Sequence, residues 1–189
     1  MREHRRQRKI GSFRQHRRAA QDSEARSVAC SVLTVSDSRT LADDASGDLL
    51  TALLEEKGHS IVARHLLPDD PTRVGLWIDE QVADQRVQAI LTTGGTGIAR
   101  RDATIDAVRA RLAIELPGFG ELFRMVSFEE VGAAAMLSRA LAGVALGERP
   151  DGDPGVIVFA MPGSRNAVET AMRKLVLPEI SHLVWERRR

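Results

Sequence analysis

The stretch of this sequence with the clearest capacity for chemistry is TGGTG, formed by Thr93, Gly94, Gly95, Thr96 and Gly97. Three glycines in four positions allow backbone conformations with positive φ and a close approach to a ligand. Successive N–H groups in such a turn form a hollow that binds an anion, and the Thr96 hydroxyl adds a donor. A phosphate or pyrophosphate is the expected ligand, and a tight turn without a ligand is the alternative. The stretch matches neither GxxxxGK(S/T) nor GxGxxG, so it predicts neither of those two motifs.

Two carboxylates, Asp69 and Asp102, are expected close to this turn because each follows the end of a predicted strand. Mg²⁺ prefers a few carboxylate ligands together with phosphate oxygens and water. A metal and an anion-binding turn together would support phosphoryl or nucleotidyl transfer by positioning and charge neutralisation. Helix capping is the alternative role, for Asp102 at a helix that begins near Thr104 and for Asp70 at a helix after Pro71.

Further polar residues stand at other predicted strand and helix boundaries. Pro162, Gly163 and Ser164 lie between a strand and a helix, where N–H groups and the positive end of the helix dipole favour an anion. Ser164 serves as a helix N-cap in the simpler interpretation. Arg139, next to Ser138, either reaches an anion or is solvated. No G-x-S-x-G motif occurs, which argues against a Ser-His-Asp hydrolase.

The spacing of apolar residues predicts the elements that position these side chains. Continuous apolar runs at 28–36, 60–67, 87–93 and 156–161 are typical of buried strands. A shorter alternating segment follows at 140–144.

Apolar residues at helical spacing follow three of the predicted strands. The three stripes consist of Leu49, Leu50, Leu53 and Leu54; of Val74, Trp77, Ile78 and Val82; and of Val168, Ala171, Met172 and Leu175. Ser46 is expected to cap the first of these helices and Gly58 to end it.

Strands that alternate with helices in this way predict an α/β fold with a mostly parallel sheet covered on both faces. Right-handed crossovers place the carboxyl ends of the strands at one edge, where open α/β sheets bind ligands. Ser36 and Asp37, Asp69, the TGGTG turn, and residues 162–164 all follow predicted strand ends. We therefore expect these four groups to meet at one edge of the sheet.

Length and composition exclude several classes of protein. A chain of 189 residues is the size of one domain, and its 43% hydrophobic and 28% charged residues are typical of globular proteins. No apolar run approaches the roughly 20 residues of a membrane-spanning helix. A single cysteine, Cys30, excludes a disulfide framework and a multi-cysteine metal site. With no tyrosine and 4% aromatic residues, the chain is poorly suited to stack single-stranded nucleic acid.

The first 26 residues differ from the rest of the chain in charge. They contain nine Lys/Arg and three Asp/Glu with few apolar residues, so we predict a disordered basic tail at 1–26 and a folded domain at 27–189. The tail is either a phosphate-binding arm for RNA or a membrane surface, or a solvated extension. No apolar region follows its arginines, so a secretory signal is not expected.

From about residue 28 to 184, the sequence resembles the MoaB/MogA family of molybdenum cofactor biosynthesis proteins, which also forms the G domain of gephyrin-type proteins. The resemblance lies in motifs that follow the family's order and spacing. They are LTVSD at 33–37, PD at 68–69, TTGGTG at 92–97, RDAT at 101–104, PGFGE at 117–121, LSRA at 137–140 and PGS at 162–164. The stretches 119–132 and 159–164 are most similar to the MoaB branch.

The resemblance implies a three-layer α/β/α fold with a mostly parallel sheet and a short antiparallel hairpin element. It implies Mg²⁺- and ATP-dependent adenylylation of molybdopterin, which activates the dithiolene for molybdate insertion. By the family pattern, Asp69 and Asp102 are the essential acidic residues and the expected Mg²⁺ ligands, and Thr93–Gly97 binds phosphate. Ser138 and the residues 162–164 would line the nucleotide and pterin pocket. A cytoplasmic trimer or hexamer is expected, with other proteins of the pathway as further partners.

Two hypotheses remain at this point: an adenylyltransferase, and a non-catalytic molybdopterin-binding or scaffold protein of the same fold. Retention of both Asp69 and Asp102 favours the enzyme, because a protein that only binds has no need of two metal-ready carboxylates. Phe119, Phe123 and Phe128 are expected to supply apolar contacts, either within the core or between subunits. The segments 1–26 and 147–155 fall outside the family pattern that we identify. Nucleic acid and membranes are not expected partners.

Overall fold

The computed structural model describes residues 27–99, 102–147, 149 and 153–188. Predictions for the tail at 1–26, for Arg101 and for part of the 147–155 segment therefore lie outside the described residues. Among the residues that the structure does describe, no helix is both long enough and apolar enough to cross a lipid bilayer.

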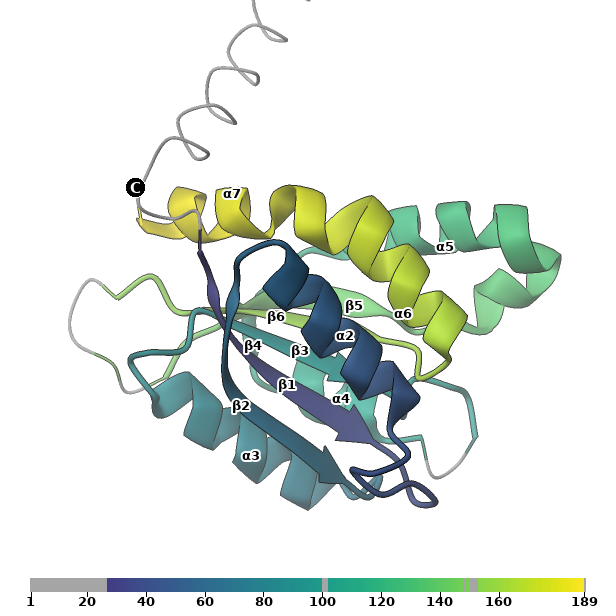
Figure 1. The fold of residues 1–189 in the computed structure, drawn as a ribbon, viewed down its shortest axis with the longest axis horizontal. Coiled ribbons are helices and arrows are strands. Elements are labelled where there is room, and N and C mark those ends of the chain that lie inside the picture. The colour runs from purple at the N-terminus through teal and green to yellow at the C-terminus, as the bar shows by residue number, and fades with distance from the viewer. Residues whose placement is uncertain (1–26, 100–101, 148, 150–152, 189) are drawn as a thin grey trace, which may run out of the picture.

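Six strands of the described chain form one sheet, in the order β2-β1-β3-β6-β5-β4 (Figure 1). Their bounds are β1 Ala29–Val35, β2 Ser60–Leu67, β3 Ala89–Thr93, β4 Leu112–Glu115, β5 Leu141–Ala145 and β6 Val156–Met161. β1, β2, β3 and β6 run parallel, whereas β5 pairs antiparallel with both β4 and β6. The mostly parallel sheet with a short antiparallel element is thus confirmed.

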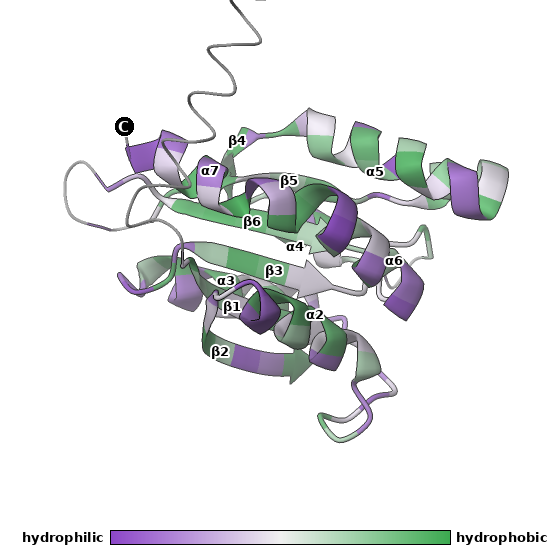
Figure 2. Ribbon diagram, turned by 45° about the horizontal axis from the view of Figure 1, so that its top comes forward, coloured by the Kyte–Doolittle hydropathy of each residue, from purple (hydrophilic) through white to green (hydrophobic). Residues whose placement is uncertain are grey.

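Helices cover both faces of the sheet, which confirms the three layers. On one face lie α2 (Ala45–Glu56), α5 (Pro117–Val131), α6 (Arg165–Ala171), the π-helical turn η3 (Met172–Val176) and α7 (Leu177–Arg188). On the other face lie α3 (Pro71–Ala83) and α4 (Thr104–Arg109). A 3-10 helix, η2 (Gly132–Leu137), joins α5 to β5. Figure 2 shows apolar residues along the central strands β3 and β6, with apolar and polar residues alternating along α5.

β1 shows why the central strands read as continuous apolar runs. Its successive residues face the two helical layers in turn: Val32 packs in the core under α2 and Leu33 in the core over α3. Its buried polar side chains are paired, because Ser31 donates to Gln81 Oε1 at 2.7 Å and Thr34 donates to Asp44 Oδ2 at 2.7 Å. A strand buried on both sides cannot alternate between apolar and charged residues.

The predicted start of the first helix was wrong by two residues. α2 begins after Asp44, whose carboxylate accepts a hydrogen bond from Gly47 N, and Ser46 lies within the first turn. Asp44 is the cap because its longer side chain reaches the free N–H of Gly47. The hydroxyl of Ser46 donates instead to the carbonyl of Gly163, 2.8 Å away. Gly58, with φ of +80°, follows the helix as predicted.

Two elements near the middle of the chain were not predicted. β4 is only four residues long, lies at the edge of the sheet and is mostly exposed, and its apolar run of three residues is too short to predict a strand. α5 buries Phe123, while Phe119 packs edge-on against Phe159. Phe128 is 61% exposed. The three phenylalanines therefore divide between the core and the surface.

Candidate functional site

The loops at the carboxyl ends of β1, β2, β3 and β6 meet at one edge of the sheet, as predicted. Asp37, after β1, accepts a hydrogen bond from the backbone N–H of Asp69, after β2, at 3.0 Å. Thr93, at the end of β3, donates from its hydroxyl to the carbonyl of Pro162, after β6, at 2.9 Å. Residues far apart in the sequence are thereby joined into one polar surface.

The glycine turn is seated between the ends of β1 and β6. Gly94 and Gly95 have φ of +100° and +61°, a region that side chains disfavour. A methyl group on Gly94 would collide with the carbonyl of Val35, and one on Gly163 would lie 3.0 Å from Gly94 Cα. Positions 94 and 95 therefore require glycine, for backbone conformation and for close packing.

Asp69 lies against the middle of this turn. Its Oδ1 accepts hydrogen bonds from Ala103 N at 3.3 Å and from the Thr104 hydroxyl at 3.0 Å. Its Oδ2 faces the turn, only 2.7 Å from the position that a methyl group on Gly95 would occupy. One oxygen thus holds the start of α4, and the other faces Gly95.

Asp102 does not cap α4, so that alternative was wrong. The helix begins after Ala103, whose own side chain makes no capping hydrogen bond. Asp102 instead turns back, where its Oδ2 accepts a hydrogen bond from Ala99 N at 2.8 Å and lies 2.5 Å from the position of a methyl group on Gly97. Asp70, by contrast, does cap α3, accepting from Thr72 N at 2.8 Å and from the next N–H at 3.1 Å.

Arg139 donates to acceptors of the protein from all three nitrogens of its guanidinium, and its side chain remains 30% exposed. Its Nε donates to Gly97 O at 2.8 Å, its Nη1 pairs with Asp106 at 3.0 Å, and its Nη2 donates to the carbonyl of Asp102. Its backbone N–H also points to the carbonyl of Thr96, at 3.4 Å. The arginine therefore ties the glycine turn to the start of α4.

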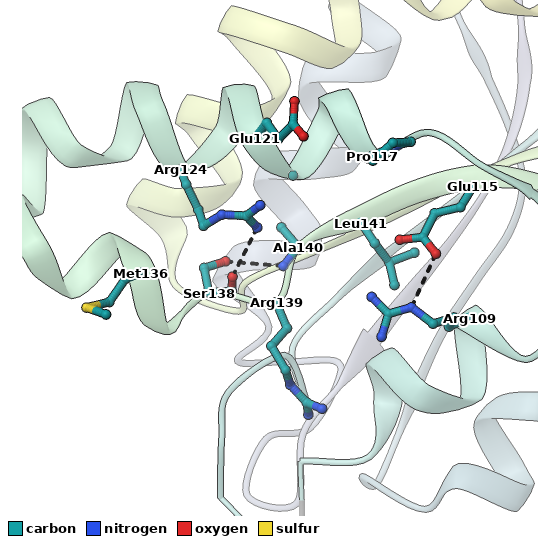
Figure 3. A pocket seen from close by; sticks show the side chains of 11 residues that line it. Arg109, Glu115, Pro117, Glu121, Arg124, Met136, Ser138, Arg139, Ala140 and Leu141 are labelled. Carbon is teal, nitrogen blue, oxygen red and sulfur yellow. Dashed lines mark hydrogen bonds and ion pairs between the residues drawn. The ribbon is translucent and has the colours of Figure 1, made fainter.

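A cavity of about 300 Å³ lies beside this edge, between α5, the end of α4, β4 and β5 (Figure 3). Ser138 and Arg139 line it, together with Arg109, Glu115 and Arg124. Arg109 pairs with Glu115 at 3.3 Å, and Arg124 donates to Ser138 O at 3.4 Å. The other predicted site residues do not line this cavity, so the predicted set divides between a strand-end edge and an adjoining cavity.

Arg39 and Ser46, which were not predicted as site residues, hold the loop after β6. Ser164 caps α6 by accepting from Ala167 N at 3.2 Å, as the simpler interpretation proposed. The carbonyl of Gly163 accepts from the Ser46 hydroxyl at 2.8 Å and from Arg39 Nη1 at 3.4 Å. Ser36 closes its own loop, its hydroxyl accepting from Ser38 N at 3.4 Å. The sequence signal that could have indicated Arg39 as a site residue is its positive charge, two residues after Asp37.

The carboxylates at this edge are suited to a hard cation that would also bind the phosphate oxygens of a substrate. Within the described part of the chain, no three His, Cys, Asp or Glu side chains gather as a self-sufficient metal site. The carboxylates of Asp69 and Asp102 nevertheless stand against Gly95 and Gly97 of the glycine turn. Mg²⁺ is held in this way, by one or two carboxylates and by the phosphates of a substrate.

Comparison with known proteins agrees with this geometry. The family model described as "Probable molybdopterin binding domain" matches residues 31–182. A molybdenum cofactor biosynthesis protein B from Halalkalibacterium halodurans is 43% identical over 176 residues, covering 93% of this chain and 96% of that protein. A match of that extent reaches into residues 1–26, whereas the family model begins at residue 31.

Solved structures give the same result. The crystal structure of a molybdenum cofactor biosynthesis protein B is 43% identical with a TM-score of 0.79, covering 87% of this chain and 98% of that chain. That of a tungsten cofactor synthesizing protein MoaB from Pyrococcus furiosus is 36% identical with a TM-score of 0.76, covering 86% of this chain and 98% of that one. With its sequence and its fold in agreement, this chain belongs to the MoaB/MogA family of molybdenum cofactor biosynthesis proteins.

Proposed function

We propose that the protein transfers an adenylyl group from Mg-ATP to molybdopterin before molybdate is inserted. The observation that carries the proposal is the placement of the Asp69 and Asp102 carboxylates against Gly95 and Gly97. A glycine turn and two carboxylates in contact supply the parts that nucleotidyl transfer needs, because that reaction depends mainly on positioning and charge neutralisation.

The residues of this chain then act on the two substrates as follows. The N–H groups of Gly95, Thr96 and Gly97 bind the phosphates of ATP, since that of Gly94 donates to Met161 O, and the contacts of Asp69 with Ala103 and Thr104 fix the orientation of Asp69. Mg²⁺, when bound to the Asp69 and Asp102 carboxylates and to phosphate oxygens, would neutralise the charge around the transferring phosphorus. The phosphate of molybdopterin attacks the α-phosphorus and pyrophosphate leaves, so no side chain is needed as a covalent nucleophile.

The cavity beside the edge is our candidate position for the pterin ring. Its volume of about 300 Å³ is at the lower end of the range for small-molecule sites. Arg109, Arg124 and Glu115 line it with donors and acceptors, which a pterin ring would match through its amino and carbonyl groups. Ser138 and Arg139 connect this cavity to the glycine turn.

Substitution of Asp102 by Asn tests the proposal. The amide oxygen of Asn can still accept the hydrogen bond from Ala99 N, so the loop and the stability should be preserved. Loss of the charge should lower adenylyl transfer by about 100-fold or more, with the affinity for molybdopterin little changed. Both quantities are measured on the same sample, with purified molybdopterin, ATP and Mg²⁺.

Asp70→Asn is the matched control, because it removes the same charge from a side chain that caps α3 and can still cap it as Asn. Transfer by this variant should stay close to the wild-type rate. Wild-type transfer by Asp102→Asn would show that Asp102 only closes the loop. No transfer by the wild-type protein, with molybdopterin bound, would favour the scaffold hypothesis instead.

We also propose that the protein assembles in multiples of three, as the family resemblance implies. Large apolar side chains are exposed along α5 and η2, a surface that we call the α5–η2 patch. Its members are Leu122, Met125, Phe128, Val131, Met136 and Leu137, each 50% exposed or more. Contiguous exposed apolar side chains are typical of protein–protein contacts.

A further inference from the structure

Four carboxylates are found among the described residues of the strand-end edge. Asp37, Asp69 and Asp102 lie around the glycine turn, and Asp106 lies on α4 next to it. A polyphosphate approaching this edge would be repelled unless cations compensate, and a bound Mg²⁺ would offset only part of the charge. Among the described residues, a basic side chain that can turn to a phosphate would compensate this charge.

Arg139 does not meet this need. All three nitrogens of its guanidinium donate to protein acceptors, and its charge is paired with Asp106 at 3.0 Å. If it left these partners for a phosphate, it would release the glycine turn that is meant to bind that phosphate. Its role is to position the turn.

Arg39 lies on the same edge and has fewer hydrogen-bond partners than Arg139 among the described residues. Within the described part of the chain, its hydrogen bonds are made by Nη1, to the Ser46 hydroxyl at 3.3 Å and to the Gly163 carbonyl at 3.4 Å. Both acceptors are neutral and both distances are long for hydrogen bonds. Among the ion pairs between described residues, none involves Arg39.

The loop that carries Arg39 holds it next to the turn. Gly163, which Arg39 contacts, packs directly on Gly94. Asp37, two residues earlier, is bonded to the backbone of Asp69. Beyond it the loop is closed by Asp43, which accepts from the backbone N–H and the hydroxyl of Thr40. These hydrogen bonds, and to a smaller extent the charge of Arg39, lower the pKa of the Asp43 carboxyl.

We propose that Arg39 binds the phosphates of the nucleotide, as the cation that lets an acidic edge accept a polyphosphate. This inference rests on the proposed function, because it takes the glycine turn to be the nucleotide site. The guanidinium offers two parallel N–H donors to phosphate oxygens, and such charge-assisted pairs are stronger than its present contacts with neutral oxygens.

The experiment measures the dissociation constants of Mg-ATP and of adenosine by calorimetric titration. Arg39→Gln should bind Mg-ATP at least tenfold more weakly and adenosine as the wild type does, since only the phosphates lose a partner. Arg39→Lys should recover part of the affinity for Mg-ATP, because it keeps the charge but not the paired donors. Arg86→Gln is the charge-matched control, since Arg86 pairs with Asp84 in the turn before β3, at the opposite end of that strand.

Ser46→Ala separates phosphate binding from a purely structural role. It removes the 2.8 Å bond to the Gly163 carbonyl and leaves the positive charge in place. An equal loss of Mg-ATP affinity in Ser46→Ala and Arg39→Gln would overturn the proposal, because Arg39 would then act only by holding Gly163. Unchanged Mg-ATP binding by Arg39→Gln would overturn the role of Arg39 but leave the proposed function standing. A wild-type protein that binds no Mg-ATP would overturn both.

Discussion

At the scale of single residues, each of two carboxylates at the edge of the sheet both holds a backbone segment in place and faces the glycine turn. Asp69 holds the start of α4 with one oxygen and faces Gly95 with the other. Asp102 similarly closes a loop and lies against Gly97. Substitutions that keep an oxygen in place but remove the charge therefore separate these two roles better than alanine does.

His59 gives a pH-dependent prediction at this scale. It is buried, and its Nδ1 accepts the N–H of Val28 at 3.1 Å, which requires that nitrogen to be unprotonated. Burial lowers the pKa of His59, so below about pH 6.5 the unfolded chain binds more protons than the folded one. The free energy of unfolding should therefore fall as the pH falls below about 6.5, by up to about 1.4 kcal/mol per pH unit.

His59→Asn removes the titrating ring and keeps an oxygen acceptor near the position of Nδ1. Urea unfolding at pH 7.5, 6.5 and 5.5 should show a shallower loss of stability in the variant than in the wild type, even if the variant is less stable throughout. Equal slopes for the two proteins would contradict the assignment to His59.

At the scale of elements, a buried network joins β1, α2 and β2 beneath the edge. Asp44 is fully buried and accepts from Thr34 at 2.7 Å, from Gly47 N at 2.9 Å and from Arg64 at 3.2 Å. The network fixes the start of α2, which in turn places Ser46 against the loop after β6. An unpaired charge left inside such a network is costly.

Asp44→Ala should reduce the free energy of unfolding by about 3 kcal/mol, because Thr34, Gly47 N and Arg64 all lose a buried acceptor. Asp48→Ala is the control, since Asp48 also pairs with Arg64, at 2.7 Å, but its side chain is 60% exposed. That change should cost about 1 kcal/mol or less, as is usual for exposed pairs. Urea unfolding of both variants compares the two costs directly, and similar values would argue against the buried network.

At the scale of the whole molecule, the α5–η2 patch gives the prediction on assembly. The mass of the wild-type protein by light scattering at micromolar concentration should be a multiple of three subunits. Phe128→Glu places a charge on the patch at a side chain that is 61% exposed, so the mass should fall while the fold is kept.

Leu76→Glu provides the comparison, because Leu76 is 58% exposed on α3, in the opposite helical layer. This variant should keep the wild-type mass. A monomeric wild-type protein would refute the assembly, and an unchanged mass for Phe128→Glu would move the contact away from the patch.

Sequence alone determined the elements that depend on local pattern. The bounds of β2 and β6 agree with the predicted strands, and Asp70 with Pro71 starts α3 as predicted. The convergence of Asp37, Asp69, the glycine turn and Pro162 also followed from sequence, because handed crossovers leave one arrangement of parallel strands. These features rest on periodicity, capping and chain handedness, which neighbouring residues largely decide.

The tertiary structure alone decided how the polar side chains share partners. Arg139 is occupied by acceptors more than thirty residues away, and Ser46 turns from a helix cap to the carbonyl of Gly163, 117 positions along the chain. β4 forms because β5 offers it an edge to pair with, although its own four residues are too few to predict a strand. A side chain takes the partner that folding brings to it, and the choice between competing hydrogen bonds depends on distances that no local pattern contains.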